Sequence, residues 1–306
     1  MQFEWRGVFP ALTTKFTVED QLDLPAFAKN LHAQMDAGID GIILGGTLGE
    51  ASVLTTIEKE KLVRHTVQIA QDRLPVILNI AEGSTSEAIR QSALAKEWGA
   101  SGLMILPPMR YKSDHHETVA YFRTIADSTD LPIMIYNNPI DYKIEVTIEM
   151  FAELTSCTNI QAVKESTRDI SNVNRMLNRF GDRFKILCGV DTLAMEELLM
   201  GATGWVAGLV CAFPKETVAV YRLTKSGKIK EALEIYRWFL PLLELDIHPK
   251  LVQYIKLAES RTGLGSEQVR PPRLTLSGSE REKILHIIDE GIKKRPVLPD
   301  YLSLPA

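Results

Sequence analysis

A lysine stands near the end of a short apolar segment, Ile160–Ser166, in the middle of the chain. Burying a charged ammonium in such a segment costs free energy. Lys164 therefore extends its amine to solvent, pairs with a carboxylate, or loses its proton. Desolvation lowers a lysine pKa from about 10.4 toward neutrality, and the neutral amine condenses with a ketone or imine carbon to give a Schiff base. The segment by itself does not distinguish a lysine that is solvated or paired from a nucleophilic lysine.

A tyrosine ends the preceding apolar segment, Pro132–Tyr136. A phenol beside an amine can move protons while an imine forms and hydrolyses. A core tyrosine with a bonded hydroxyl is the alternative. The position of Tyr136 at the end of a segment favours the catalytic interpretation.

A glycine-rich loop, Gly45–Glu50, follows an earlier apolar segment. Its backbone amides can hold a carboxylate, and the Thr47 hydroxyl can bond to that carboxylate or to Tyr136. A plain tight turn is the alternative. A phosphate loop is disfavoured because the Gly-Lys-Ser/Thr ending is absent.

Two arginines follow apolar segments and can bind a carboxylate. Arg110 comes after Leu106-Pro107-Pro108, and Arg168 comes shortly after Lys164. A planar guanidinium grips a carboxylate through two hydrogen bonds. A solvated surface arginine is the alternative for both.

Eight apolar segments of this kind alternate with stretches of helical period, which predicts eight strand–helix units. The segments are Gly7–Thr13, Gly41–Gly46, Pro75–Ile80, Gly102–Leu106, Pro132–Tyr136, Ile160–Lys164, Lys185–Gly189 and Gly204–Val210. Continuous apolar runs are typical of parallel strands buried on both faces. Eight units favour a closed (β/α)8 TIM barrel over an open α/β sheet, because no dinucleotide turn follows the first segment.

The predicted catalytic barrel spans residues 1–226, and the predicted helical C-terminal extension, packed on the barrel, spans 227–306. Within the extension, Ser279–Glu282 has the form of a capping box that opens the last helix. In a barrel of this kind, chemistry lies at the carboxyl ends of the strands. Lys164, Tyr136, Thr47 and Arg110 all follow strands in this way.

The composition indicates a globular protein. The 306 residues include 35 Lys+Arg and 39 Asp+Glu, a net charge of -4. A mildly acidic chain without long apolar runs predicts neither a nucleic-acid partner nor a membrane partner. Three dispersed cysteines and the absence of a signal-peptide pattern predict a cytoplasmic location, and six histidines without ligand spacing predict no metal.

Three motifs together resemble the dihydrodipicolinate synthase / N-acetylneuraminate lyase family. They are Gly46-Thr47-Leu48-Gly49-Glu50, Tyr136-Asn137-Asn138-Pro139 and Lys164-Glu165. The resemblance implies a Schiff-base lyase acting on 2-oxo acids, without a cofactor, that assembles as a homotetramer. Lys164 is then the Schiff-base lysine, Tyr136 the proton shuttle and Thr47 a third catalytic residue.

The chain departs from the synthase pattern of this family at three places. Leu48 replaces a second hydroxyl residue, Asp141 stands where the synthases carry an arginine for a second carboxylate, and Met109-Arg110-Tyr111 replaces a tyrosine-rich loop. Framework stretches are more similar to the 1-pyrroline-4-hydroxy-2-carboxylate deaminases of hydroxyproline degradation. These stretches are Gly7–Phe16, Gly204–Val210, Ala232–Leu243 and Lys256–Glu259.

The expected function is therefore deamination of 1-pyrroline-4-hydroxy-2-carboxylate to 2,5-dioxopentanoate and ammonia. The residues expected to bind this small-molecule substrate are Gly46, Leu48, Arg110, Tyr111, Ser166 and Val206. An aldolase or dehydratase of a linear 2-oxo sugar acid and a dihydrodipicolinate synthase are the enzymatic alternatives. A barrel that only senses a metabolite is the non-enzymatic alternative, which a buried amine beside a phenol disfavours.

Overall fold

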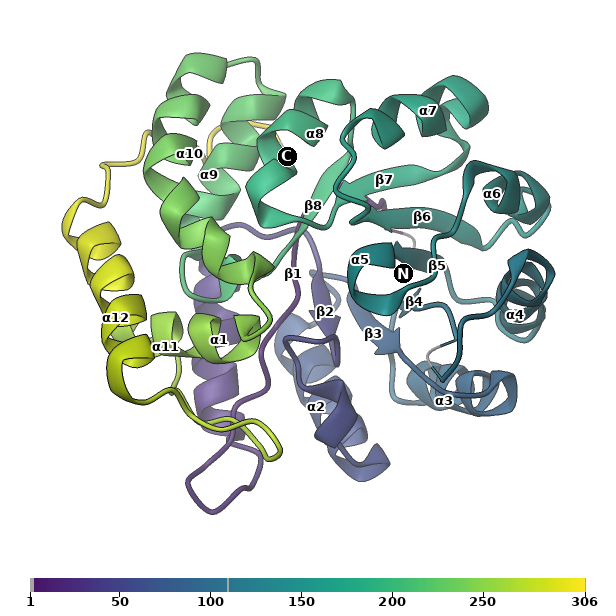
Figure 1. Cartoon of the computed structure of the whole chain (residues 1–306), viewed down its shortest axis with the longest axis horizontal. Helices are drawn as coiled ribbons and strands as arrows, with labels where there is room; N and C mark the ends of the chain where they lie inside the picture. Colours follow the sequence, from purple (N-terminus) through teal and green to yellow (C-terminus); the bar gives the residue numbers. More distant parts are fainter. Residues whose placement is uncertain (1–2, 109, 306) are drawn as a thin grey trace.

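Eight strands form one sheet in which every hydrogen-bonded pair is parallel, in the order β1-β8-β7-β6-β5-β4-β3-β2 (Figure 1). The strands are β1 (Gly7–Pro10), β2 (Ile42–Leu44), β3 (Val76–Ile80), β4 (Gly102–Ile105), β5 (Ile133–Asn137), β6 (Ile160–Glu165), β7 (Lys185–Cys188) and β8 (Gly204–Ala207). A parallel bridge between Ala11 and Ile43 brings the two ends of the sheet together. This computed structural model describes residues 3–108 and 110–305. The predicted (β/α)8 barrel is confirmed.

Helices follow the strands and surround them (Figure 1). They are α1 (Leu24–Asp36), α2 (Thr56–Ala70), α3 (Thr85–Glu97), α4 (His115–Asp127), α5 (Pro139–Tyr142), α6 (Ile148–Leu154), α7 (Ser171–Phe180), α8 (Ala194–Met200) and α9 (Pro214–Lys225). Most strand residues are buried on both faces, as continuous apolar segments require. The single turn α5 was not predicted, and it contributes to the site described below.

The C-terminal extension consists of α10 (Ile229–Leu243), the short 3-10 turn η5 (Glu244–Ile247), α11 (Leu251–Thr262) and α12 (Gly278–Lys293). These helices lie along one flank of the barrel, beside α1 and α9 (Figure 1). Two buried ion pairs attach α11 to the barrel: Lys256 pairs with Glu50, and Glu259 pairs with Lys15. The extension is therefore fixed to loops that follow the first two strands.

The predicted capping box at the start of α12 is wrong. The helix begins at Gly278 after Ser277, so Ser279 lies inside it. The Glu280 carboxylate instead accepts a hydrogen bond from the Tyr254 hydroxyl at 2.9 Å and pairs with Lys250. Glu280 is the third residue after the actual N-cap, Ser277, and these tertiary contacts occupy the carboxylate that a capping box with Ser277 would need.

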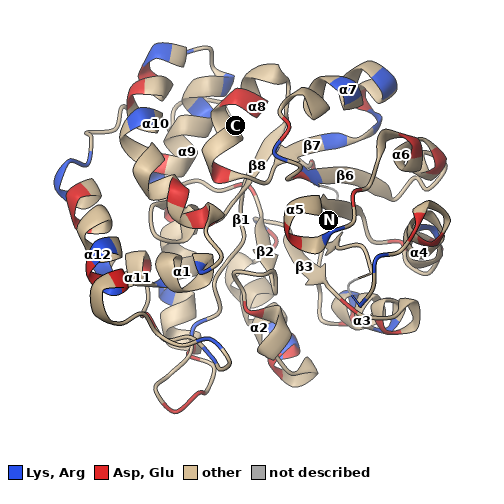
Figure 2. Cartoon of the chain, in the orientation of Figure 1, with Lys and Arg blue, Asp and Glu red and all other residues tan. Residues whose placement is uncertain are grey.

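Charged residues of both signs alternate over the outer helices, whereas the strands carry few (Figure 2). In the described part of the chain, no helix has the length and apolar character needed to cross a bilayer.

Candidate active site

Lys164 lies one residue before the end of β6, in register with Tyr136 of β5 and Leu187 of β7. The lysine is 7% exposed, and its Nζ atom lies 4.1 Å from the centroid of the Tyr136 ring. Two other lysines are buried, Lys15 and Lys256, and each makes a close ion pair with a glutamate. Within the described residues, no hydrogen bond or ion pair engages the Lys164 amine.

Burial lowers the pKa of the Lys164 amine, because water no longer solvates the ammonium form. Charges on Asp246, Tyr142 and Asp191 oppose this shift from a distance. A lysine with a lowered pKa carries a free lone pair at neutral pH for a larger fraction of the time. The environment therefore suits a nucleophilic amine better than a structural cation.

Tyr136 is buried beside this amine, and its hydroxyl accepts a hydrogen bond from the Asn138 side chain at 3.2 Å. Burial raises the pKa of the phenol above its usual value. The neutral phenol can therefore donate a proton to a group bound at Lys164 and regain it from another donor.

The Thr47 hydroxyl shares a hydrogen bond with Tyr142 of α5, and not with Tyr136. The rings of Tyr136 and Tyr142 meet edge to face, with centroids 5.5 Å apart. Asn138 caps α5 by accepting from the Asp141 amide at 3.1 Å, and Pro139 occupies the first turn. The capped turn delivers a second phenol to the site.

Asn137, the last residue of β5, holds the loop that contains α5. Its side-chain amide donates to the Val146 carbonyl at 3.0 Å and accepts from the Val146 amide at 2.9 Å. This double contact closes the segment 138–145 into a compact loop. The asparagine of the Tyr136-Asn137 motif thus has a structural role.

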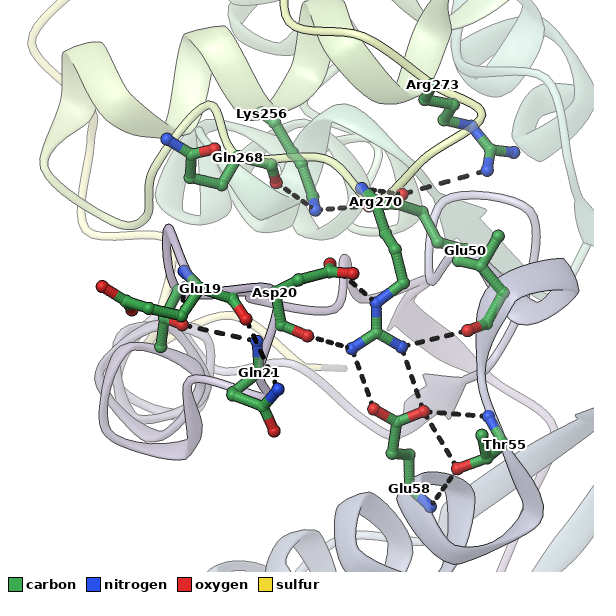
Figure 3. A network of polar contacts seen from close by, with 12 residues as sticks. Glu19, Asp20, Gln21, Glu50, Thr55, Glu58, Lys256, Gln268, Arg270 and Arg273 are labelled. Carbon is green, nitrogen blue, oxygen red and sulfur yellow. Dashed lines mark hydrogen bonds and ion pairs between the residues drawn. The ribbon is translucent and has the colours of Figure 1, made fainter.

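Residues of the C-terminal extension contact the glycine-rich loop and hold it in place (Figure 3). Glu50 is buried in the left-handed region at φ 55°, and pairs with Lys256. Its other oxygen accepts from the Arg270 amide at 3.0 Å. The Arg270 guanidinium forks onto Glu58 at 2.8 and 3.0 Å, and its Nε donates to Asp20 at 3.0 Å. These contacts fix the loop that carries Thr47.

Arg168 is the arginine that lines the same cavity as Lys164, and its side chain is exposed. It adopts a left-handed backbone at φ 65°. The buried Glu165 carboxylate supports this turn, because it accepts from the Thr167 amide and from Asn172, each at 2.8 Å. Glu165 therefore positions the loop that presents Arg168.

Arg110 lines a neighbouring cavity, which shares Thr47 with the first and is also lined by Tyr142. Tyr111 is 56% exposed and lines neither of these two cavities. Met109, the first residue of this predicted loop motif, lies outside the described residues. The geometry therefore favours Arg168 over Arg110 as the cation nearest to Lys164.

The other residues expected from the sequence share one small cavity of about 60 Å³. They are Gly46, Thr47, Leu48, Tyr136, Lys164, Ser166 and Val206. Gly189 also lines it, and an added Cβ there would lie 2.6 Å from Cγ of Lys164. A glycine at this position leaves room for the lysine side chain.

Two carboxyl groups near Lys164 were not predicted from the sequence. Asp191, after β7, accepts from Trp205 Nε1 at 2.9 Å and from the amides of Gly208 and Leu209 at 3.1 and 2.8 Å. Asp246, in η5, lines the cavity itself. Its position at the end of a strand would have identified Asp191, but no sequence pattern marks Asp246.

No group of three or more His, Cys, Asp or Glu side chains in residues 3–108 and 110–305 is arranged to hold a metal ion. The chemistry that the cavity offers is that of one amine, one phenol, carboxyl groups and a threonine hydroxyl, which is bonded to the second phenol, Tyr142.

Comparison with known proteins identifies this barrel with its helical extension as a lyase, and it also gives the family. The profile of the Dihydrodipicolinate synthetase family matches residues 4–291, and the chain belongs to this family.

Curated relatives share about 30% identity. A 4-hydroxy-tetrahydrodipicolinate synthase of Exiguobacterium sibiricum is 31% identical over 288 residues, covering 93% of this chain and 96% of the relative. That of Aquifex aeolicus is 30% identical, covering 93% and 97%.

Solved structures agree over almost the whole chain. The dihydrodipicolinate synthase of Aquifex aeolicus superposes with a TM-score of 0.89 at 29% identity, covering 94% of this chain and 98% of the other. YagE, a prophage protein of this family from E. coli K12 solved in complex with pyruvate, gives 0.88 at 25% identity, covering 94% and 99%.

Proposed function

We propose that the chain is a lyase that forms a Schiff base between Lys164 and a 2-oxo acid or a cyclic imine carrying a carboxylate. The observation that carries this proposal is the buried, unpaired amine of Lys164, 4.1 Å from the Tyr136 ring. A structural lysine at such a site would have the carboxylate partner that Lys15 and Lys256 have. A barrel that only senses a metabolite has no use for this arrangement.

The preferred substrate is 1-pyrroline-4-hydroxy-2-carboxylate. Two aspartates, Asp141 and Asp246, and one arginine, Arg168, line the cavity. This charge pattern suits a substrate with one carboxylate and a nitrogen that becomes a free amine during the reaction. A substrate with a second carboxylate would face Asp141, which occupies the place of the synthase arginine.

The deaminase reaction then follows from Schiff-base chemistry. Lys164 adds to the imine carbon, the ring carbon–nitrogen bond breaks, and a free amine remains at the far end. Loss of a proton beside the iminium gives an enamine, which expels the ring hydroxyl as water. The amine end tautomerises to an imine, whose hydrolysis releases ammonia. Hydrolysis at Lys164 releases 2,5-dioxopentanoate.

Dihydrodipicolinate synthase is the second candidate, because the relatives described above are named 4-hydroxy-tetrahydrodipicolinate synthase or dihydrodipicolinate synthase. The first half of the reaction would be the same, with pyruvate bound at Lys164. Its Schiff base would then condense with an aldehyde that bears a second carboxylate. An aldolase or dehydratase of a linear 2-oxo sugar acid also shares this first half.

The first test is trapping with borohydride, followed by product analysis. We expect pyruvate and borohydride to add one reduced adduct at Lys164, and Lys164→Ala to abolish it, while Lys228→Ala on the surface keeps it. An adduct that persists in Lys164→Ala on another residue would contradict the assignment.

The substrate is decided by three parallel assays. Ammonia released in step with 2,5-dioxopentanoate supports the deaminase. Consumption of pyruvate with aspartate semialdehyde supports the synthase. Turnover of linear 2-oxo sugar acids alone supports the aldolase or dehydratase. The homotetramer implied by the resemblance stays a prediction, which sedimentation of the purified chain would test.

A further inference from the structure

The C-terminal extension places a carboxyl group in the cavity of Lys164. Asp246 belongs to η5, between α10 and α11, and lines this cavity with Lys164, Tyr136 and Arg168. It reaches the barrel at Gly208, where an added Cβ would lie 2.1 Å from Asp246 Oδ1. The absence of a side chain at Gly208 is therefore what admits the carboxyl group.

The titratable and charged groups around Asp246 are Asp191, Lys164, Asp141, Arg168 and Tyr136. Burial raises the pKa of Asp191 as well, but three donors bond to its carboxylate and oppose that shift, so of the two groups Asp191 is better suited to carry the negative charge. Within the described residues, no hydrogen bond engages the Asp246 carboxyl. Burial and the neighbouring Asp191 raise the pKa of Asp246 well above its ordinary value. Two carboxyl groups in such different surroundings divide into one base and one acid.

Asp246 and Lys164 therefore both favour their neutral forms at rest, because each loses solvation on burial. No ion pair within 4.0 Å joins them in the described chain, unlike Lys256 and Glu50. Asp141 is a poorer candidate for an acid at this point, since its carboxylate is held by the Asn138 amide at 2.7 Å.

We propose that Asp246 is the catalytic acid that protonates the leaving atom when the Schiff base forms at Lys164. The inference rests on the proposed function. With a 2-oxo acid, the Lys164 amine adds to the carbonyl carbon, and a proton moves from nitrogen to oxygen to give a neutral carbinolamine. Asp246 then donates its proton to the hydroxyl, the carbon–oxygen bond breaks, and water leaves with the bonding pair. The nitrogen lone pair forms the carbon–nitrogen double bond.

The products of this step are a cationic iminium and an Asp246 carboxylate. Because the charges appear together in a buried cavity, each stabilises the other at the moment of its formation. A carboxylate present from the start would instead favour the ammonium form of Lys164, which cannot attack. With a cyclic imine, the same proton goes to the ring nitrogen.

The experiment measures how fast the adduct forms, by mixing enzyme with pyruvate and quenching with borohydride at increasing times. We expect Asp246→Asn to slow adduct formation by about 10²-fold, the usual scale of a lost general acid. Glu244→Gln is the matched control, because this neighbouring carboxylate of η5 is exposed. In the wild type, the rate of adduct formation should fall as pH rises through the pKa of Asp246. This decrease should be absent in Asp246→Asn.

Acetate or formate should restore part of the rate in Asp246→Ala, which a merely structural role would not allow. Adduct formation in Asp246→Asn at the wild-type rate and with the wild-type pH profile would overturn the role of Asp246 while leaving the Schiff base intact. Absence of any adduct in the wild type, both with pyruvate and with 1-pyrroline-4-hydroxy-2-carboxylate, would overturn the proposed function, and with it the inference that rests on it.

Discussion

Three buried lysines of this chain differ in what surrounds their amines. Lys15 and Lys256 each meet a glutamate, whereas Lys164 faces an aromatic ring and has carboxyl groups nearby that make no ion pair with it. A paired ammonium keeps its proton, because the carboxylate replaces the lost water. Only the amine without such a partner is free to become a nucleophile, and this difference is visible at the level of single side chains.

Substitution of each candidate arginine in turn tests which of the two binds the substrate carboxylate. Arg168→Met should raise KM for the 2-oxo acid or imine about tenfold, because a charge-assisted hydrogen bond contributes about 1.5 kcal/mol or more. Arg110→Met should change KM much less, since Arg110 lines the neighbouring cavity. Steady-state kinetics of both variants decide the matter, and a large effect of Arg110→Met alone would reverse the assignment.

The turn α5 shows how a short element completes the site. Asn137 fixes both ends of its loop, Asn138 caps the turn, and Tyr142 then reaches Thr47. The phenols of Tyr136 and Tyr142 lie next to each other as a result. The site thus receives its hydroxyl groups from two loops, after β2 and after β5.

Removal of the second phenol tests whether these hydroxyls act together. We expect Tyr142→Phe to lower kcat by about 10²-fold with a smaller change in KM, because Thr47 loses its partner for proton transfer. Tyr254→Phe, which removes a hydroxyl that bonds to Glu280, serves as the control. If Tyr142→Phe retains the wild-type kcat, Tyr142 only fills space in the site.

At the scale of the whole molecule, the C-terminal extension braces the catalytic end of the barrel. Lys256 and Arg270 hold Glu50 and so the glycine-rich loop (Figure 3). The turn η5 brings Asp246 into the cavity of Lys164. Folding of the extension onto the barrel is therefore coupled to completion of the site.

Loss of one partner from the buried pair should be costly. Lys256→Met leaves the Glu50 charge buried without its ammonium partner and should lower the free energy of unfolding by about 3 kcal/mol. The double variant Lys256→Met, Glu50→Gln should recover part of this loss, because no uncompensated charge remains. Denaturant unfolding of the two variants checks this, and equal stability of the single variant and the wild type would contradict it.

The sequence by itself determined the barrel and the positions of Lys164 and Tyr136. Strands buried on both faces must be apolar throughout, so eight such runs and the polar residues that end them are readable along the chain. The predicted strands are somewhat longer than the observed ones, because buried loops beyond a strand are apolar too. For example, Gly204–Val210 was predicted, and β8 spans Gly204–Ala207.

Only the tertiary structure decided which other groups meet Lys164. Tyr142 reaches Thr47 across 95 positions of the chain, and Asp246 arrives from an extension with no strand to mark it. Neither contact leaves a periodic pattern, because each depends on how a loop packs and not on local residue spacing. The position of Arg110 in a neighbouring cavity is of the same kind, since a loop's direction is set by the elements it touches.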